Sequence, residues 1–266
     1  MKKLLALLLA FAMIFAMAAC GSQPAAGGDT AEKTWEDELG TKGLLRVGMA
    51  ADYPPYESYD ANGNVVGLDP DFAELMADYL GVELEIVPMS FDTIVSAVAA
   101  GTVDMGLSCF SYTEERAAAV LFTDTYMTST QVCFASTQHG INSLEDLKGG
   151  LVAAGNGTTG YYLMEELAPT YGYDYQTSEI AIMAEALKAG TLHAGITEQC
   201  VADSYIAANP GDFKIIANDM TVEEIKAIAN FNSPKLVEKI NEFLADFVGS
   251  EAYDELLVKW FEQELE

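Results

Sequence analysis

A run of hydroxyl-bearing residues that ends in an arginine offers the clearest binding chemistry in this 266-residue sequence. The run is Ser108–Arg116, and it follows the segment Val103–Leu107, which predicts a buried strand. Thr113 is a typical N-cap residue, so a helix is expected to begin just after it. Arg116 then falls in the first helical turn, where a positive charge costs about 0.3–1 kcal/mol.

Two interpretations of Arg116 are consistent with this pattern. In the first, the guanidinium simply forms an ion pair with a nearby glutamate. In the second, Arg116 holds an anion together with the helix N-terminus and the hydroxyls of Ser108, Ser111 and Thr113.

A glycine-rich loop, Gly155–Gly160, is a second candidate anion site. It matches the dinucleotide-binding fingerprint, and Glu179 follows about 20 residues later. However, the loop lies in the middle of the chain rather than after the first strand. We therefore expect only the simpler property, that backbone amides near Thr158 and Thr159 bind a small anion.

The N-terminus has the features of a secretory signal. Lys2 and Lys3 precede an apolar run that ends at Ala19, and Cys20 follows directly. This order resembles the bacterial lipoprotein signal, in which that cysteine is lipidated; the alternative is ordinary cleavage near Ala19 with an incidental cysteine. Export also removes the chain from nicotinamide cofactors, which argues further against dinucleotide binding.

The composition excludes several classes of protein. Thirteen Lys and Arg residues against 41 Asp and Glu residues give a net charge of −28, so we expect no nucleic acid partner. Without Cys20, three cysteines remain, Cys109, Cys133 and Cys200, and an odd number excludes a complete disulfide framework. The cysteine spacing fits no zinc pattern, and the sequence has only two histidines.

Strand and helix signals alternate in two separate stretches. From Leu44 to Leu107 they give β-α-β-α-β, in which Asp69 is expected to cap the first helix, and a second alternation runs from Leu151 to Ala217. This order predicts an α/β protein with parallel sheets, in which ligands bind beyond the carboxyl ends of the strands.

The order of these motifs resembles the extracytoplasmic amino-acid-binding proteins of ABC importers, polar amino-acid class, over about residues 43–262. The matching motifs are Tyr53-Pro54-Pro55-Tyr56-Glu57, Gly67-Leu68-Asp69-Pro70-Asp71, Phe91-Asp92, Ala100-Gly101-Thr102-Val103-Asp104, Thr113-x-x-Arg116, Phe122-Thr123-Asp124-x-Tyr126, Gly157-Thr158-Thr159 and Lys259-Trp260-Phe261.

The resemblance implies a two-lobed periplasmic-binding-protein-like fold. Each lobe would be a mainly parallel sheet flanked by helices, and two crossings would form a hinge. The expected division is a signal peptide over 1–19, a lipidated cysteine and flexible tether over 20–42, lobe one over 43–129 plus 222–266, and lobe two over 130–221.

The resemblance also implies a ligand site. Arg116 would hold the ligand carboxylate with help from lobe two, two aromatic rings would sandwich the ligand side chain, and Glu198 would replace the family's usual Asp at the α-ammonium. The residues predicted to bind the ligand are Tyr53, Phe91, Ser108, Cys109, Ser111, Thr113, Arg116, Thr158, Thr159 and Glu198.

The implied function is to bind a free amino acid and deliver it to an ABC importer permease. We expect a monomer attached to a bacterial membrane through Cys20, without metal or cofactor. Because Ala50 stands where relatives selective for arginine or lysine often have an acid, and Asp52 fits an exposed loop acid, a neutral ligand is expected. The alternative is an enzyme of the same fold that dehydrates prephenate or arogenate with Glu198 as general acid.

Overall fold

The computed structural model describes residues 33–262. The predicted signal peptide and the lipidation site at Cys20 lie outside the described residues, as does most of the predicted tether. No helix in the described part of the chain is both long enough and apolar enough to cross a membrane.

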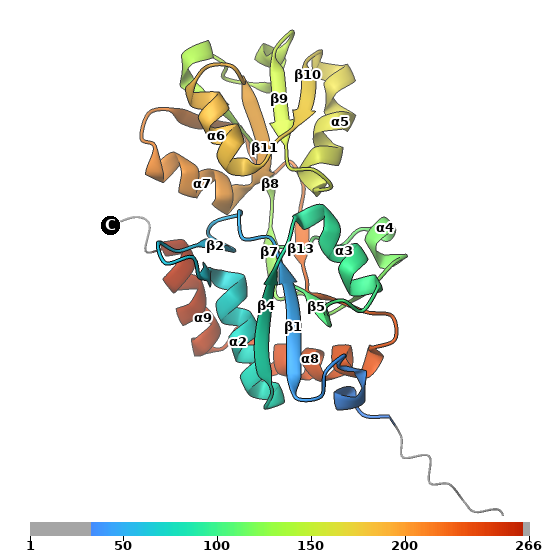
Figure 1. The fold of residues 1–266 in the computed structure, drawn as a ribbon. Coiled ribbons are helices and arrows are strands. Elements are labelled where there is room, and N and C mark those ends of the chain that lie inside the picture. Colours follow the sequence, from blue (N-terminus) through green and yellow to red (C-terminus); the bar gives the residue numbers. More distant parts are fainter. Residues whose placement is uncertain (1–32, 263–266) are drawn as a thin grey trace, which may run out of the picture. The chain divides into compact units, whose positions relative to one another are not determined.

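The first sheet has five strands in the order β4-β1-β5-β14-β6 (Figure 1). β4 and β5 run parallel to β1, and β14 is antiparallel to both of its neighbours, so four of the five strands point the same way. The strands are β1 (Leu44–Met49), β4 (Glu83–Pro88), β5 (Met105–Gly106), β6 (Leu121–Phe122) and β14 (Ile228–Ala229).

Helices flank this first sheet. They are α2 (Leu68–Leu80), α3 (Phe91–Ala99), α8 (Pro234–Phe247) and α9 (Glu251–Leu257), with a last turn η4 (Val258–Glu262). α2 packs on β4, and α3 packs on β1. Between α2 and α8, the Phe72 ring lies 5.8 Å from that of Phe243, and it stacks on Tyr126 at 4.8 Å.

The start of α2 differs from the prediction. Gly67, not Asp69, is the N-cap, and it has a φ of 147°. A Cβ at Gly67 would lie 2.1 Å from the Tyr56 carbonyl oxygen, so a larger residue does not fit there. Asp69 instead turns inward and is fully buried, where it accepts hydrogen bonds from the Cys109 amide and the Tyr126 hydroxyl. The predicted capping role of Asp69 is therefore wrong.

The second sheet repeats this plan in the order β10-β9-β11-β8-β12. β10, β9 and β11 are parallel, and β8 is antiparallel to β11 and β12. Its strands are β8 (Gln131–Ser136), β9 (Leu151–Ala154), β10 (Asp174–Thr177), β11 (Ala194–Glu198) and β12 (Phe213–Ala217). Its helices are α5 (Thr159–Tyr171), α6 (Ile180–Lys188) and α7 (Gln199–Ala208).

Two extended segments connect the two sheets (Figure 1). They are β7 (Met127–Ser129) and β13 (Glu223–Ile225), which pair antiparallel with Met127 opposite Ile225. Short elements complete the described chain: η1 (Trp35–Glu38), β2 (Ser58–Tyr59), β3 (Val65–Val66), α4 (Glu114–Ala117), η2 (Thr137–His139) and η3 (Leu144–Leu147).

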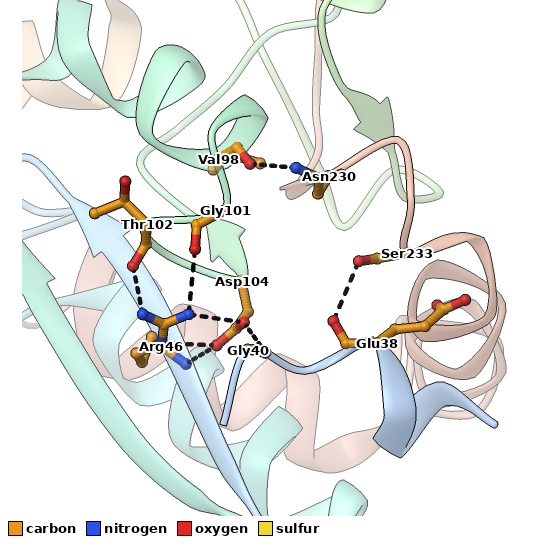
Figure 2. A network of polar contacts seen from close by, with 9 residues as sticks. All are labelled: Glu38, Gly40, Arg46, Val98, Gly101, Thr102, Asp104, Asn230 and Ser233. Atoms are coloured by element: carbon orange, nitrogen blue, oxygen red, sulfur yellow. Dashed lines mark hydrogen bonds and ion pairs between the residues drawn. The ribbon is translucent and has the colours of Figure 1, made fainter. Parts of the chain in front are cut away.

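A polar network fastens the segment before β1 to the first sheet (Figure 2). Asp104 is buried and accepts hydrogen bonds from the Gly40 amide, from the Arg46 amide and from the Arg46 guanidinium. Glu38 lies nearby and accepts at its side chain from the amide of Leu236, in the first turn of α8. The segment that contains η1 is thereby held to both the sheet and α8.

Candidate functional site

A cavity of about 530 Å³ is lined by residues from the lobe of the first sheet and from the lobe of the second sheet. Its walls come from the segments that follow β1, β4, β5, β9 and β10 and from the last residues of β11, as expected for ligand sites at the ends of parallel strands. Seven of the ten predicted ligand residues line it: Tyr53, Phe91, Ser108, Arg116, Thr158, Thr159 and Glu198.

The other three predicted residues support the wall rather than form it. The Cys109 amide donates to Asp69, with the Cys109 backbone at a φ of 48°. The Ser111 carbonyl accepts from Arg116 Nη1 at 2.6 Å. Thr113 caps α4 as predicted, because its hydroxyl accepts from the Arg116 amide at 3.1 Å.

Arg116 is held from both sides of the cavity. Besides Ser111, its guanidinium donates to the Gly157 carbonyl of the glycine loop at 2.9 Å. Its Cζ lies 5.3 Å from the ring centre of Phe91 and 5.2 Å from that of Phe110, and these two rings stack at 4.8 Å. The side chain makes no ion pair with any described carboxylate, so the interpretation of Arg116 as a partner of a nearby glutamate is not supported.

The charge on Arg116 is therefore buried without a direct ion pair to a described residue. The residue is 8 % exposed, and burial lowers the pKa of Arg116 from its usual value, although nearby charges, among them those of Glu223 and Glu115, lie close enough to oppose this shift. Arginine nevertheless stays protonated in proteins, and a desolvated cation gains most from an anion. This geometry suits a ligand carboxylate.

At the floor of the cavity, the carboxyl groups of Glu57 and Asp69 are both fully buried. Burial, and then the charge of Asp69, raise the pKa of Glu57 well above its usual range, and burial raises the pKa of Asp69 to about 6. Ser108 accepts from the Ala50 amide and donates its hydroxyl hydrogen to Glu57. The Ser108 hydroxyl thus links the floor of the cavity to the loop after β1, and its predicted contact with a ligand stays a prediction.

Glu198 is a buried acid with an unused oxygen. It is 3 % exposed; Gln131 Nε2 donates to one carboxylate oxygen at 2.6 Å, and the other oxygen has no hydrogen-bond partner among the described residues. Burial, the main cause, raises the pKa of Glu198 to about 8. A buried carboxyl that lines a cavity and has one oxygen without a described partner suits a ligand ammonium.

The glycine loop presents the start of α5 to the cavity. Thr158 is the N-cap, and its hydroxyl accepts from the Tyr161 amide at 3.1 Å. The amides of Thr159 and Gly160 are the first in the helix and so have no intrahelical acceptors. This arrangement favours an anion, as the sequence predicts for a group smaller than pyrophosphate.

Tyr53 reaches across to the second sheet. Its hydroxyl lies 2.6 Å from Thr197 Oγ1 and accepts from the Glu198 amide at 3.1 Å. Its ring stacks at 6.1 Å on Tyr56, which is fully buried. Tyr53 thus joins the end of β11 to the loop after β1, and this contact was not foreseen from the sequence.

Three further acids line the cavity: Asp52, Asp92 and Glu179. The sequence interpretation gave them no binding role. Each lies in the loop or first helical turn that follows a strand, and that position was the available signal, because parallel sheets bind ligands there. With respect to metals, no group of three or more His, Cys, Asp or Glu side chains in the described chain is arranged to hold an ion.

The site as a whole offers a buried cation, Arg116, and a buried acid, Glu198, in one cavity with an aromatic wall. A free amino acid carries the complementary pair of charges on its α-carboxylate and α-ammonium.

The sequence was compared with known families and proteins. Residues 45–263 match the family model described as bacterial extracellular solute-binding proteins, family 3. The arginine-binding extracellular protein ArtP of Bacillus subtilis (strain 168) is 33% identical over 263 residues, which cover 98% of this chain and 98% of ArtP.

Two solved structures have the same fold. An ancestral arginine-binding protein bound to arginine superposes with a TM-score of 0.78 and 34% identity, covering 82% of this chain and 98% of that chain. An ancestral amino-acid-binding protein, described as a precursor of cyclohexadienyl dehydratase, superposes with a TM-score of 0.77 and 32% identity. The match covers 86% of this chain and 100% of that chain. The predicted two-lobed α/β fold, with helices flanking two mainly parallel sheets, is confirmed.

Proposed function

This chain belongs to the bacterial extracellular solute-binding proteins, family 3, and from that premise we propose that it binds a free amino acid in the cavity between its two lobes. It then delivers the amino acid to the permease of an ABC importer. Arg116 and the start of α5 receive the α-carboxylate, and Glu198 receives the α-ammonium.

One observation carries this proposal: among the described residues, the cavity contains a buried guanidinium without a direct ion pair and a buried carboxyl with an oxygen that lacks a partner. Within the described chain the guanidinium donates hydrogen bonds to two carbonyl groups only, and a desolvated charge gains further from an ion of opposite sign; the unpartnered carboxyl oxygen is unfavourable in the same way. A zwitterion supplies both partners at once. An anion alone would leave Glu198 without one.

The cellular arrangement follows the family. We propose a monomer attached to the outer side of the membrane through a lipid on Cys20, with lobe one over 43–129 plus 222–266 and lobe two over 130–221. Replacing Cys20 with serine should abolish metabolic labelling with a fatty acid and release the chain from membranes. Labelling that persists in Cys20→Ser would contradict the anchor.

The test of ligand binding is a thermal-shift screen of the purified chain against the twenty amino acids, followed by calorimetry. A ligand at 100 times its Kd adds about 2.7 kcal/mol of stability, which raises the melting temperature by several degrees. Removing either charge from the ligand, as in an amino-acid amide or an N-acetyl amino acid, should abolish the shift. No shift with any amino acid would overturn the proposal.

A second candidate is dehydration of prephenate or arogenate. Glu198 favours it, because burial raises the pKa of this carboxyl to about 8 and keeps a proton available near neutral pH. We infer that binding is the main function, since Glu198 equally fits the α-ammonium. The chain should release no phenylpyruvate from prephenate. Release that Glu198→Gln abolishes would instead make this protein an enzyme.

A further inference from the structure

We propose that Asp52 and Glu179 form a subsite for a positively charged ligand side chain, so that this chain takes a basic amino acid such as arginine or lysine. Asp52 lies in the loop after β1, and Glu179 lies between β10 and α6, so each lobe supplies one carboxylate. The inference rests on the proposed function and names the class of its ligand.

The first step is to find the acids that carry charge in the cavity. Five carboxyl groups line it, against one lining cation, Arg116. Burial raises the pKa of Glu57 and of Glu198, which favours their neutral forms and leaves Asp52, Asp92 and Glu179 as the charged acids. Three of the five have protein partners: Glu57 accepts from Ser108, Asp92 accepts from Asn156, and Glu198 accepts from Gln131. Glu198 also keeps a buried free oxygen for the α-ammonium of the ligand.

The second step concerns the two remaining carboxylates, those of Asp52 and Glu179. No described residue donates a side-chain hydrogen bond to the carboxylate of Asp52 or Glu179, and neither forms an ion pair with a described Lys or Arg. Glu179 is the N-cap residue of α6, but its side chain makes no capping hydrogen bond. Both carboxylates are thus free to meet a ligand.

The third step is the proximity of the two acids. Partial burial, and then the charge of Glu179, raise the pKa of Asp52. Two like charges that face one cavity repel each other when it is empty, and a cation between them converts that repulsion into two attractions. A guanidinium has five N–H donors in a plane, which match two carboxylates on either side.

These acids revise the expectation of a neutral ligand. That expectation relied on Ala50 occupying the position of the usual acid and on Asp52 being an ordinary loop acid. Ala50 does line the cavity without a charge. However, Asp52 lines it too, and a second acid enters from the other lobe, at a position far from Ala50 in the sequence.

The test compares arginine with citrulline, which has the same length and shape but a neutral urea group. Asp52 and Glu179 are both exposed at the cavity rim, so water screens their charges and each carboxylate is expected to contribute about 0.5–1 kcal/mol to binding of a cationic group. Calorimetry should therefore show that arginine binds the wild-type chain about 5- to 30-fold more tightly than citrulline.

The double variant Asp52→Asn with Glu179→Gln should lose about that factor for arginine and change less than threefold for citrulline. Glu185 is an exposed acid on α6, and Glu185→Gln is the matched control. This substitution should change neither the arginine affinity nor the citrulline affinity.

The other outcomes are separable. Citrulline binding as tightly as arginine, or a double variant that keeps the arginine affinity, would overturn the cationic subsite and leave the proposed function standing. Equal losses for both ligands would also overturn it, because they would report damage to the site rather than loss of charge recognition. If no amino acid binds the wild-type chain, the proposed function fails first and this inference falls with it.

Discussion

Asn156 Nδ2 lies 2.8 Å from Asp92 Oδ2, which joins the glycine loop of the second lobe to the first turn of α3 in the first lobe. A Cβ added at Gly157 would lie 3.6 Å from the Asp92 Cβ, so the glycine loop passes close to Asp92. Like the Tyr53–Thr197 bond, the Asn156–Asp92 bond joins two side chains across the lobes at the cavity, and the side chains of Arg116 and Tyr53 also bond to backbone groups of the second lobe. Such bonds favour the arrangement that surrounds a ligand.

Replacing Asn156 with alanine should therefore weaken ligand binding without touching the ligand's charges. A single hydrogen bond contributes about 0.5–1.5 kcal/mol, or roughly 2- to 13-fold in affinity. The loss should appear mainly as faster dissociation, measured by stopped-flow fluorescence. Asn64→Ala removes a similar bond to Asp60 within one lobe and is the control. An unchanged dissociation rate in Asn156→Ala would show that this bond does not hold the lobes together.

The two arginines of the described chain should separate binding from stability. Arg116→Ala should weaken amino-acid binding by about 30-fold to several thousand-fold, because removing one partner of a buried charge pair costs about 2–5 kcal/mol. Its fold should remain, as judged by circular dichroism. Arg46→Ala should leave the affinity within twofold, since Arg46 lies in the network of Figure 2 and not at the cavity. Calorimetry with Arg116→Ala within a few-fold of wild type would remove Arg116 as the carboxylate ligand.

Asp104 provides the corresponding stability prediction. Its carboxylate is buried and satisfies the Arg46 guanidinium and two backbone amides. Asp104→Ala should lower the free energy of unfolding by about 2–4 kcal/mol, because it leaves these donors unpaired. Glu185→Gln, which breaks the exposed pair with Lys188, should change it by about 0–1 kcal/mol. Urea unfolding measures the free energy of unfolding of both variants. Equal losses in Asp104→Ala and Glu185→Gln would contradict a special role for the Asp104 network.

Much of the fold was predictable because local patterns and tertiary packing agree. The β-α-β order places Leu44–Met49 and Glu83–Pro88 in adjacent parallel strands, as the alternation of signals indicates. Thr113 caps its helix for the same reason: a side-chain oxygen meets a free amide three residues later. Asp69 was mispredicted because its partners, Cys109 and Tyr126, are distant in sequence and outweigh the local preference.

The site was predictable only as far as its motifs are local. Arg116 stands out because it is unfavourable in its own helix, and Thr158 because it begins a helix after a glycine loop. The contact of Tyr53 with Thr197 and the approach of Asp52 to Glu179 join residues more than 120 positions apart. Nothing in the spacing of those residues reveals such pairs, since they depend on how the two lobes meet.

Glu198 gives the last prediction, which concerns pH. In the empty site its pKa is about 8, well above the usual value of 4.5, so the neutral form predominates near pH 7. The folded empty chain therefore gains stability from the protonated acid at low pH and loses it as the pH rises through about 8. An α-ammonium reverses this preference, because it requires the carboxylate.

Binding of an amino acid near pH 7 should therefore release close to one proton. The association constant should rise by up to about tenfold per pH unit between pH 6 and 8 and level off above 8. Calorimetry in buffers of different ionisation enthalpy measures the released proton directly. Glu198→Gln should remove both the proton release and the slope, and it should bind more weakly than wild type at pH 8.5. A wild-type affinity that is flat from pH 6 to 8 would mean that Glu198 does not meet the ammonium.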